Sequence, residues 1–130
     1  MAEESKLTQA FLERATESLA SAQLLFDSLF FDDAVSRAYY AMYYAAKAAL
    51  ESIGIETRSH AGVINQFGLH FIKKGQLDSQ YGSMLTRAFQ ARQSSDYDVQ
   101  VNTVPLEAES VLTNAELFVA KIKELLSNQP

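Results

Sequence analysis

The chain has 130 residues, of which 48% are hydrophobic and 21% charged, a composition typical of one globular domain with its own core. It contains 5 glycines, 2 prolines and no cysteine, which favours helices over a turn-rich sheet and excludes disulfides, thiolate metal sites and cysteine nucleophiles. The net charge of −5 argues against broad, nonspecific nucleic-acid binding, and the lack of an apolar signal core or membrane-length segment predicts a cytoplasmic protein with no membrane contact.

Apolar residues recur every three or four positions and predict five helices. We expect these helices at residues 5 or 6 to 29, 33–53, 59–72, 78–94 and 105 to about 126. The second is the most apolar and should lie at the centre, because a stripe of alanines lets a neighbouring helix approach closely: Ala34, Ala38, Ala41, Ala45 and Ala49. The polar stretch 95–104 is expected to be a loop. With no strand pattern, the predicted fold class is all-α, an antiparallel helical bundle in a single domain of residues 1–130 with a core over about 6–126.

Residues that start and stop helices stand near these boundaries. Ser59 is expected to cap the third helix, and one of the aspartates Asp32 and Asp33 is expected to cap the second. Gly54 and Gly75 follow the ends of the second and third helices, where glycine readily takes the left-handed conformation that ends a helix.

Charge is spread unevenly along the chain. Residues 54–92 contain two acidic and five basic residues and both histidines, whereas residues 1–33 contain seven acidic and two basic residues and residues 93–130 six and two. The basic middle is either an accident of small numbers or a region that admits one anionic ligand at one place.

The segment of residues 92–97, Arg-Gln-Ser-Ser-Asp-Tyr, is the strongest candidate site. Arg92 follows Ala88 by four residues, so its guanidinium lies on or beside the apolar face of the fourth helix and needs an anionic partner or an interface. Asp96 is the nearest partner in sequence, and a bound phosphate is the functional alternative, because a guanidinium pairs bidentately with both groups. Either an ion pair between Arg92 and Asp96 stabilises the corner between the helix and the loop, or Arg92, Asp96 and Tyr97 bind a phosphate or nucleotide.

Four tyrosines in the second helix form two adjacent rows, Tyr39 with Tyr43 and Tyr40 with Tyr44. One row can fill the core while the other presents hydroxyl groups to water or to a partner. The second row, together with Arg37, is therefore a candidate subunit interface, with a base-stacking platform as the alternative.

The two histidines do not form a metal pair, because His60 and His70 are ten residues apart and share no helical turn. His60 directly follows the expected cap Ser59, which favours a surface or capping role. No metal site and no cofactor are expected.

Three segments in register resemble the HEPN superfamily (higher eukaryotes and prokaryotes nucleotide-binding), in particular its small stand-alone branch. They are residues 37–48, residues 59–63 and residues 92–97, and the similarity extends over about residues 6–126. The resemblance implies a helical bundle that dimerises along its central helices and pairs with a minimal nucleotidyltransferase, often as a toxin–antitoxin couple. It also implies metal-independent RNA cleavage by an arginine followed, after four to six residues, by a histidine.

This chain departs from that motif, because Arg92 matches the arginine but Tyr97 stands where the histidine is expected. A phenol with a pKa of about 10 is a poor base at neutral pH. Three hypotheses follow: a dimeric module that binds a nucleotide, an RNA phosphate or a nucleotidyltransferase; a ribonuclease toxin that uses Arg92 with Tyr97 or His60; and a purely structural interaction protein. His60 can replace the missing histidine only if the fold brings it beside Arg92.

Overall fold

The computed structural model describes residues 2–97 and 103–128, and it describes side chains for residues 6–94 and 103–128. The described residues form five α-helices and one π-helical turn: α1 (Ala2–Asp27), α2 (Phe31–Ser52), α3 (His60–Phe67), η1 (Gly68–Ile72), α4 (Ser79–Tyr97) and α5 (Pro105–Ser127). No strand occurs among them, so the predicted all-α bundle of about five helices is confirmed. None of these helices is long and apolar enough to cross a membrane.

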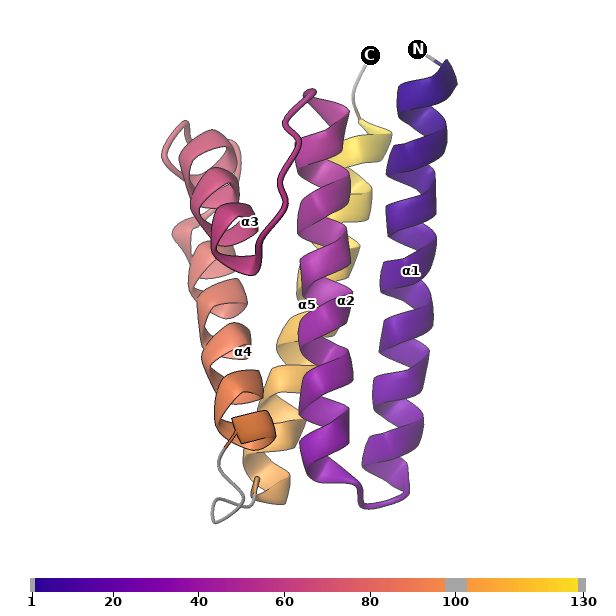
Figure 1. The fold of residues 1–130 in the computed structure, drawn as a ribbon, viewed down its shortest axis with the longest axis vertical. Helices are drawn as coiled ribbons and strands as arrows, with labels where there is room; N and C mark the ends of the chain where they lie inside the picture. Colours follow the sequence, from indigo (N-terminus) through magenta and orange to yellow (C-terminus); the bar gives the residue numbers. More distant parts are fainter. Residues whose placement is uncertain (1, 98–102, 129–130) are drawn as a thin grey trace.

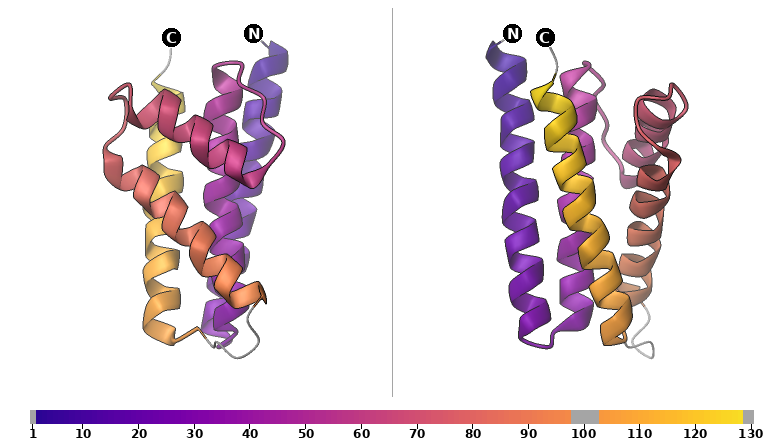
Figure 2. Two further views of the ribbon diagram at one scale, coloured as in Figure 1. Left: turned by 60° about the vertical axis from the view of Figure 1, so that its left-hand side comes forward. Right: turned by 180° about the vertical axis from the view of Figure 1, so that it is seen from behind.

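The helices form two layers around α2. Helices α1, α2 and α5 lie side by side with their long axes roughly aligned (Figure 1). Helix α3, its extension η1 and α4 form a hairpin that crosses the opposite side of α2 and α5 and opens away from the turn at residues 73–78 (Figure 2, left). Helix α2 contacts all four other α-helices, which confirms its predicted central position.

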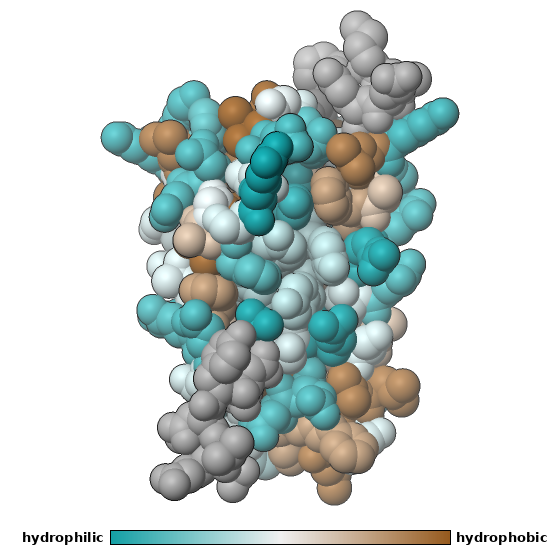
Figure 3. Space-filling view, viewed as in Figure 1, coloured by the Kyte–Doolittle hydropathy of each residue, from teal (hydrophilic) through white to brown (hydrophobic). Residues whose placement is uncertain are grey.

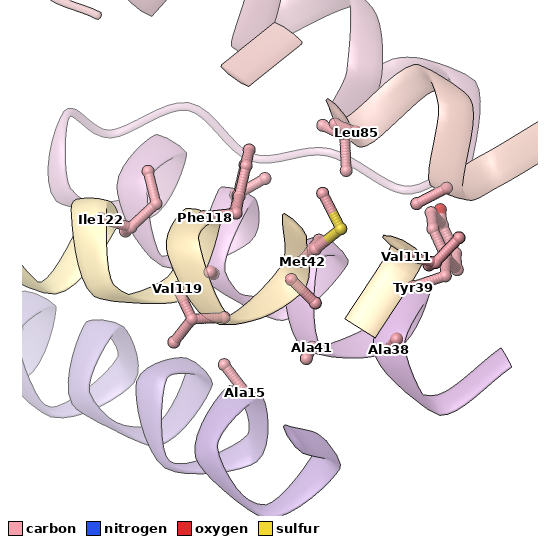
Figure 4. Close-up of a cluster of buried hydrophobic side chains, with 14 of the residues drawn as sticks. Ala15, Ala38, Tyr39, Ala41, Met42, Leu85, Val111, Phe118, Val119 and Ile122 are labelled. Carbon is pink, nitrogen blue, oxygen red and sulfur yellow. The ribbon is translucent and has the colours of Figure 1, made fainter. Parts of the chain in front are cut away.

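The core forms where α2 faces its neighbours (Figure 4). All five alanines of the predicted stripe are buried, and their small side chains allow close helix packing. Larger fully buried side chains come from every layer: Tyr39, Met42, Phe67, Phe71, Leu85, Phe118 and Ile122. Because each such side chain contributes about 1.5–3 kcal/mol when buried, the core fixes how α3 and α4 sit on α2.

Several predicted helix ends are confirmed. The Ser59 hydroxyl accepts a hydrogen bond from the Gly62 amide at 2.9 Å and caps α3. Gly54 and Gly75 have φ angles of +77° and +82° and follow the ends of α2 and η1. These signals are local, and for this reason sequence alone could identify them.

Two predicted boundaries are wrong. Helix α2 starts two residues early, at Phe31, with Phe30 at its N-cap position and no side-chain cap, so neither aspartate caps it. Asp32 instead accepts a hydrogen bond from the Thr103 amide at 3.0 Å and ties the start of α2 to the segment before α5. Helix α4 continues to Tyr97, so residues 95–97 are helical rather than part of a loop; residues 98–102 of that predicted loop lie outside the described residues.

Candidate functional site

The tyrosines of α2 lie at the junction of α2 with α3 and α4. Tyr39 is fully buried, whereas Tyr40, Tyr43 and Tyr44 are half-buried. Their rings pack mainly edge-to-face or tilted, with centroids 5.4–6.1 Å apart. Of the two predicted rows, only Tyr39 belongs wholly to the core, and the other three rings leave part of their surface open to a ligand or a partner.

His60 is the first residue of α3 and lies on this tyrosine cluster. Its Nδ1 is 2.6 Å from the Tyr39 hydroxyl oxygen. The imidazole is half-buried, 4.6 Å from the Tyr43 ring centroid and stacked on Phe89 at 6.0 Å. The expectation of a surface or capping role for His60 is therefore wrong. Ser59 alone caps the helix, and the packing of α3 across α2 turns the next side chain inward.

The environment keeps both partners of this hydrogen bond neutral. Burial raises the pKa of Tyr39 well above its usual value of about 10. Burial, followed by the positive charges of Arg92 and Lys47, lowers the pKa of His60. A neutral imidazole carries one ring hydrogen, so two tautomers fit the contact. If the Tyr39 hydroxyl donates, His60 Nε2 carries the hydrogen; if Nδ1 donates to the hydroxyl oxygen, Nε2 is a free base.

Arg92 reaches the same cluster from α4. The carbon atom of its guanidinium lies 5.3 Å from the Tyr40 ring centroid and 6.0 Å from that of Tyr39, both within cation–π range. Its neighbours Ala88 and Phe89 are buried and half-buried, so Arg92 does lie beside the apolar face of α4 as the spacing predicts. The fold thus brings Arg92 and His60 onto one ring, that of Tyr39. We refer to these three residues as the Tyr39–His60–Arg92 site.

The remaining predicted residues have different outcomes. The side chains of Asp96 and Tyr97 lie outside the described residues, so the predicted pair of Arg92 with Asp96 and the role of Tyr97 stay predictions. Arg37 lies with its guanidinium 4.8 Å from the Tyr40 ring centroid. Whether Arg37, Tyr40 and Tyr44 form a subunit interface also stays a prediction.

Two residues of this region were not predicted as site residues. Lys47 Nζ lies 5.8 Å from the Tyr43 ring centroid and donates a hydrogen bond to the Thr57 carbonyl oxygen at 3.2 Å. Phe89 stacks on His60. Both carry a signal in the sequence, because Lys47 stands four residues after Tyr43 and Phe89 three residues before Arg92, spacings that place each pair on one helix face.

The arrangement suits a ligand that is both flat and anionic. Half-buried aromatic rings can stack on a nucleobase, and the guanidinium of Arg92 can bind a phosphate bidentately. The described residues include no group of three or more His, Asp or Glu side chains that could hold a metal ion. The side chains of the Tyr39–His60–Arg92 site can bind a phosphate, stabilise negative charge and exchange a proton at His60.

Comparison with known proteins agrees with the sequence resemblance. The model of the HEPN domain family matches residues 8–125. Two proteins of Methanocaldococcus jannaschii, named "Putative toxin MJ0605" and "Putative toxin MJ0142", are 42% and 36% identical to this chain; each alignment covers 91% of this chain, with 87% and 80% of the relatives. A UPF0332 protein of Thermotoga maritima is 30% identical over 98% of this chain and 97% of its own length.

Proposed function

Because this chain belongs to the HEPN domain family, we propose that it is the HEPN member of a toxin–antitoxin-like pair and that its Tyr39–His60–Arg92 site binds a phosphate group of RNA. Two relatives that align over most of their length carry toxin names, which supports the first part. The second part rests on a single observation. His60 from α3 and Arg92 from α4 meet at Tyr39 of α2, beside rings on which a base can stack.

The distribution of charge supports one localised site. The chain has a net charge of −5, and this opposes a general attraction to nucleic acid. At the tyrosine cluster, however, the cations Arg37, Lys47 and Arg92 gather around the rings. These cations complement an anionic group, and the net negative charge of the chain disfavours nonspecific binding of nucleic acid to its acidic surfaces.

RNA binding by an Arg92→Ala variant tests this proposal. A charge-assisted hydrogen bond contributes about 1.5–3 kcal/mol, so we expect the affinity for single-stranded RNA to fall about tenfold to a hundredfold. The matched control is Arg14→Ala, which removes an exposed arginine from α1 on the far side of α2 (Figure 1). Equal affinities for the two variants and the unchanged protein would overturn the proposed site and leave a purely structural role for Arg92.

RNA cleavage is a second candidate function, favoured by the placement of His60. This function uses the tautomer in which Nδ1 donates to the Tyr39 hydroxyl oxygen, because Nε2 is then unprotonated and can accept the proton of a ribose 2′-hydroxyl. The 2′-oxygen then bonds to the adjacent phosphorus as the bond to the 5′-oxygen breaks, and Arg92 stabilises the negative charge on the non-bridging phosphate oxygens. Water protonates the leaving 5′-oxygen, and the protonated His60 returns its proton to the resulting hydroxide. The products are a 2′,3′-cyclic phosphate and a 5′-hydroxyl. Cleavage in chelator that is lost in both His60→Ala and Arg92→Ala supports this function; cleavage that survives either substitution contradicts it.

A homodimer and a minimal nucleotidyltransferase partner complete the proposal. Arg37, Tyr40 and Tyr44 lie half-buried on α2, beside the Tyr39–His60–Arg92 site, and are suited to a contact between two central helices. Size-exclusion chromatography with light scattering should show a dimer for the wild-type protein. The double variant Arg37→Ala with Tyr44→Ala should dimerise more weakly. If the wild-type protein is a monomer, the proposed interface is wrong, and the Tyr39–His60–Arg92 site would have to act within one chain.

A further inference from the structure

A second candidate surface lies on the outer side of the hairpin formed by α3, η1 and α4. It is a groove of about 490 Å³ between α3–η1 and α4. Two cations line it, Lys73 and Arg87, together with three hydroxyl side chains, Ser79, Ser83 and Thr86. The residues that line it include no carboxylate, although the chain as a whole is acidic. The nearby Asp78 carboxylate accepts hydrogen bonds from the Ser79 hydroxyl and the Gln80 amide, at 3.4 and 3.3 Å.

Two glycines shape this groove: Gly82 allows its two walls to approach each other, and Gly68 leaves free space inside it. At Gly82 an added Cβ atom would lie 3.3 Å from Ile72 Cγ1, so the absence of a side chain lets η1 approach α4. At Gly68 an added Cβ atom would meet nothing within 4 Å, and the backbone there is helical, with φ −59°. Gly68 also begins the π-helical turn, a distortion that often occurs at functional sites. The groove therefore has free space at Gly68 that an L-residue could enter without strain.

The groove ends one helical turn from the Tyr39–His60–Arg92 site. On α3, His60 stands four residues before the groove residue Ile64. On α4, Phe89 stands three residues after the groove residue Thr86, and Phe89 and His60 stack on each other. Because residues three or four apart are neighbours on a helix surface, both helices lead from the groove to the site. From Ser79 to Arg87 the groove follows α4 for about 12 Å, at 1.5 Å per residue, which is longer than one phosphate group.

We propose that this groove binds the sugar–phosphate backbone of the RNA strand whose phosphate occupies the Tyr39–His60–Arg92 site. This inference rests on the proposed function and extends it, because it makes the substrate a single strand rather than a mononucleotide. Lys73 and Arg87 pair with phosphates, and the hydroxyls of Ser83 and Thr86 donate to phosphate or ribose oxygens. No base-reading group is needed, so binding in the groove depends on strand length and salt rather than on sequence.

The test compares a dinucleotide with a single-stranded RNA of about ten nucleotides, within the range that single-strand binding surfaces cover. The groove variants are the double substitution Lys73→Ala with Arg87→Ala, and separately Gly68→Glu, which places a carboxylate in the free space. The matched control is Lys6→Ala with Arg14→Ala, which removes the same charge from exposed positions on α1. Circular dichroism of each variant shows that the fold is intact.

Both groove variants should bind the longer RNA with an affinity at least about fivefold lower than that of the wild-type protein. For the double variant the log–log salt slope should fall by about 1.4, which is about 0.7 for each lost phosphate contact. The dinucleotide and the control pair should be unaffected. If the groove variants bind the longer RNA as tightly as the control does, while Arg92→Ala lowers the affinity for both RNAs, the groove inference fails and the proposed function stands. If Arg92→Ala changes neither ligand, the proposed function fails, and this inference fails with it.

Discussion

At the scale of single residues, the central contact is the hydrogen bond between Tyr39 and His60. A buried phenol hydroxyl requires a partner, since leaving it without one costs about 1–3 kcal/mol. In this chain the partner is an imidazole contributed by a different helix, 2.6 Å away. The contact fixes the ring of His60 and leaves Nε2 as the atom through which it can meet a ligand, so the structural requirement of Tyr39 also orients the candidate site.

Replacing Tyr39 by phenylalanine removes the hydroxyl and keeps the ring. We expect the free energy of unfolding to fall by about 0.5–1.5 kcal/mol, the net contribution of one hydrogen bond, and the ¹⁵N shifts of His60 to change as its tautomer is released. Urea denaturation and NMR measure the two effects. Tyr44→Phe, at a half-buried position on the same helix, is the control. Unchanged His60 shifts in Tyr39→Phe would show that the contact does not set the tautomer.

The lowered pKa of His60 makes stability depend on pH. Burial and the nearby cations depress the pKa in the folded state below the value of about 6.5 that the unfolded chain has. Between these two pKa values the unfolded state binds more protons, so the contribution of His60 is complete above about pH 6.5 and is lost as the pH falls through the folded pKa.

An NMR titration of His60 should therefore give a midpoint below about 6.5. Arg92→Ala should move that midpoint upward, because it removes a positive neighbour. The difference in unfolding free energy between the unchanged protein and His60→Gln should grow as the pH rises across the same window. A midpoint above 6.5, or one that Arg92→Ala leaves in place, would contradict the described environment.

At the scale of helices, sequence predicts what is local and misses what depends on packing. The cap at Ser59 and the stop at Gly54 follow from residues within one turn, and both are confirmed. The position of His60 against Tyr39, 21 residues away in the chain, depends on the angle at which α3 crosses α2. Asp32 is not the predicted cap, because α2 already begins at Phe31; its carboxylate instead accepts a hydrogen bond from the Thr103 amide, a contact across 71 residues that no local pattern signals.

The cap of α3 links helix stability to the site, because the capped helix begins with His60. Ser59→Ala should cost about 0.5–2 kcal/mol of unfolding free energy and should also weaken RNA binding, since the first turn of α3 carries His60. Ser127→Ala, at the exposed end of α5, is the control and should be nearly neutral. Unfolding in urea and the RNA affinity are measured together. If Ser59→Ala lowers stability but leaves the RNA affinity unchanged, the cap does not contribute to the RNA-binding site.

The corner between α1 and α2 contains a strained residue. Leu29 has φ +69°, a conformation that favours glycine, and its side chain is 73% exposed. Leu29→Gly should therefore stabilise the protein by about 0.5–1 kcal/mol, because leucine in the left-handed region costs about 1–2 kcal/mol and little buried surface is lost. Leu24→Gly, also exposed but inside α1, should destabilise by about 1 kcal/mol. If thermal unfolding shows that both variants are stabilised, or that both are destabilised, Leu29 is not strained in the way described.

At the scale of the whole molecule, the two layers of helices meet at α2, which carries Tyr39 of the candidate site. Helices α1 and α5 pack against α2 and leave α3 and α4 to frame the tyrosine cluster on its other side (Figures 1 and 2). On the face shown in Figure 3, apolar surface gathers at the lower end over the α1–α2 corner, where Leu24, Leu29 and Phe30 are exposed. The middle of that face, over α2, is neutral to hydrophilic. The candidate RNA surface is thus distinct from the exposed apolar corner.

The proposed RNA-binding site requires that Arg92 and His60 contact the same phosphate. A double-mutant cycle of Arg92→Ala and His60→Gln on RNA affinity tests this most directly, because residues that share a ligand couple and independent residues do not. We predict a coupling energy of about 0.5–3 kcal/mol, with the double variant losing less affinity than the sum of the single losses. Additive losses within about 0.5 kcal/mol, or two single variants that bind RNA as the unchanged protein does, would contradict the existence of a shared site.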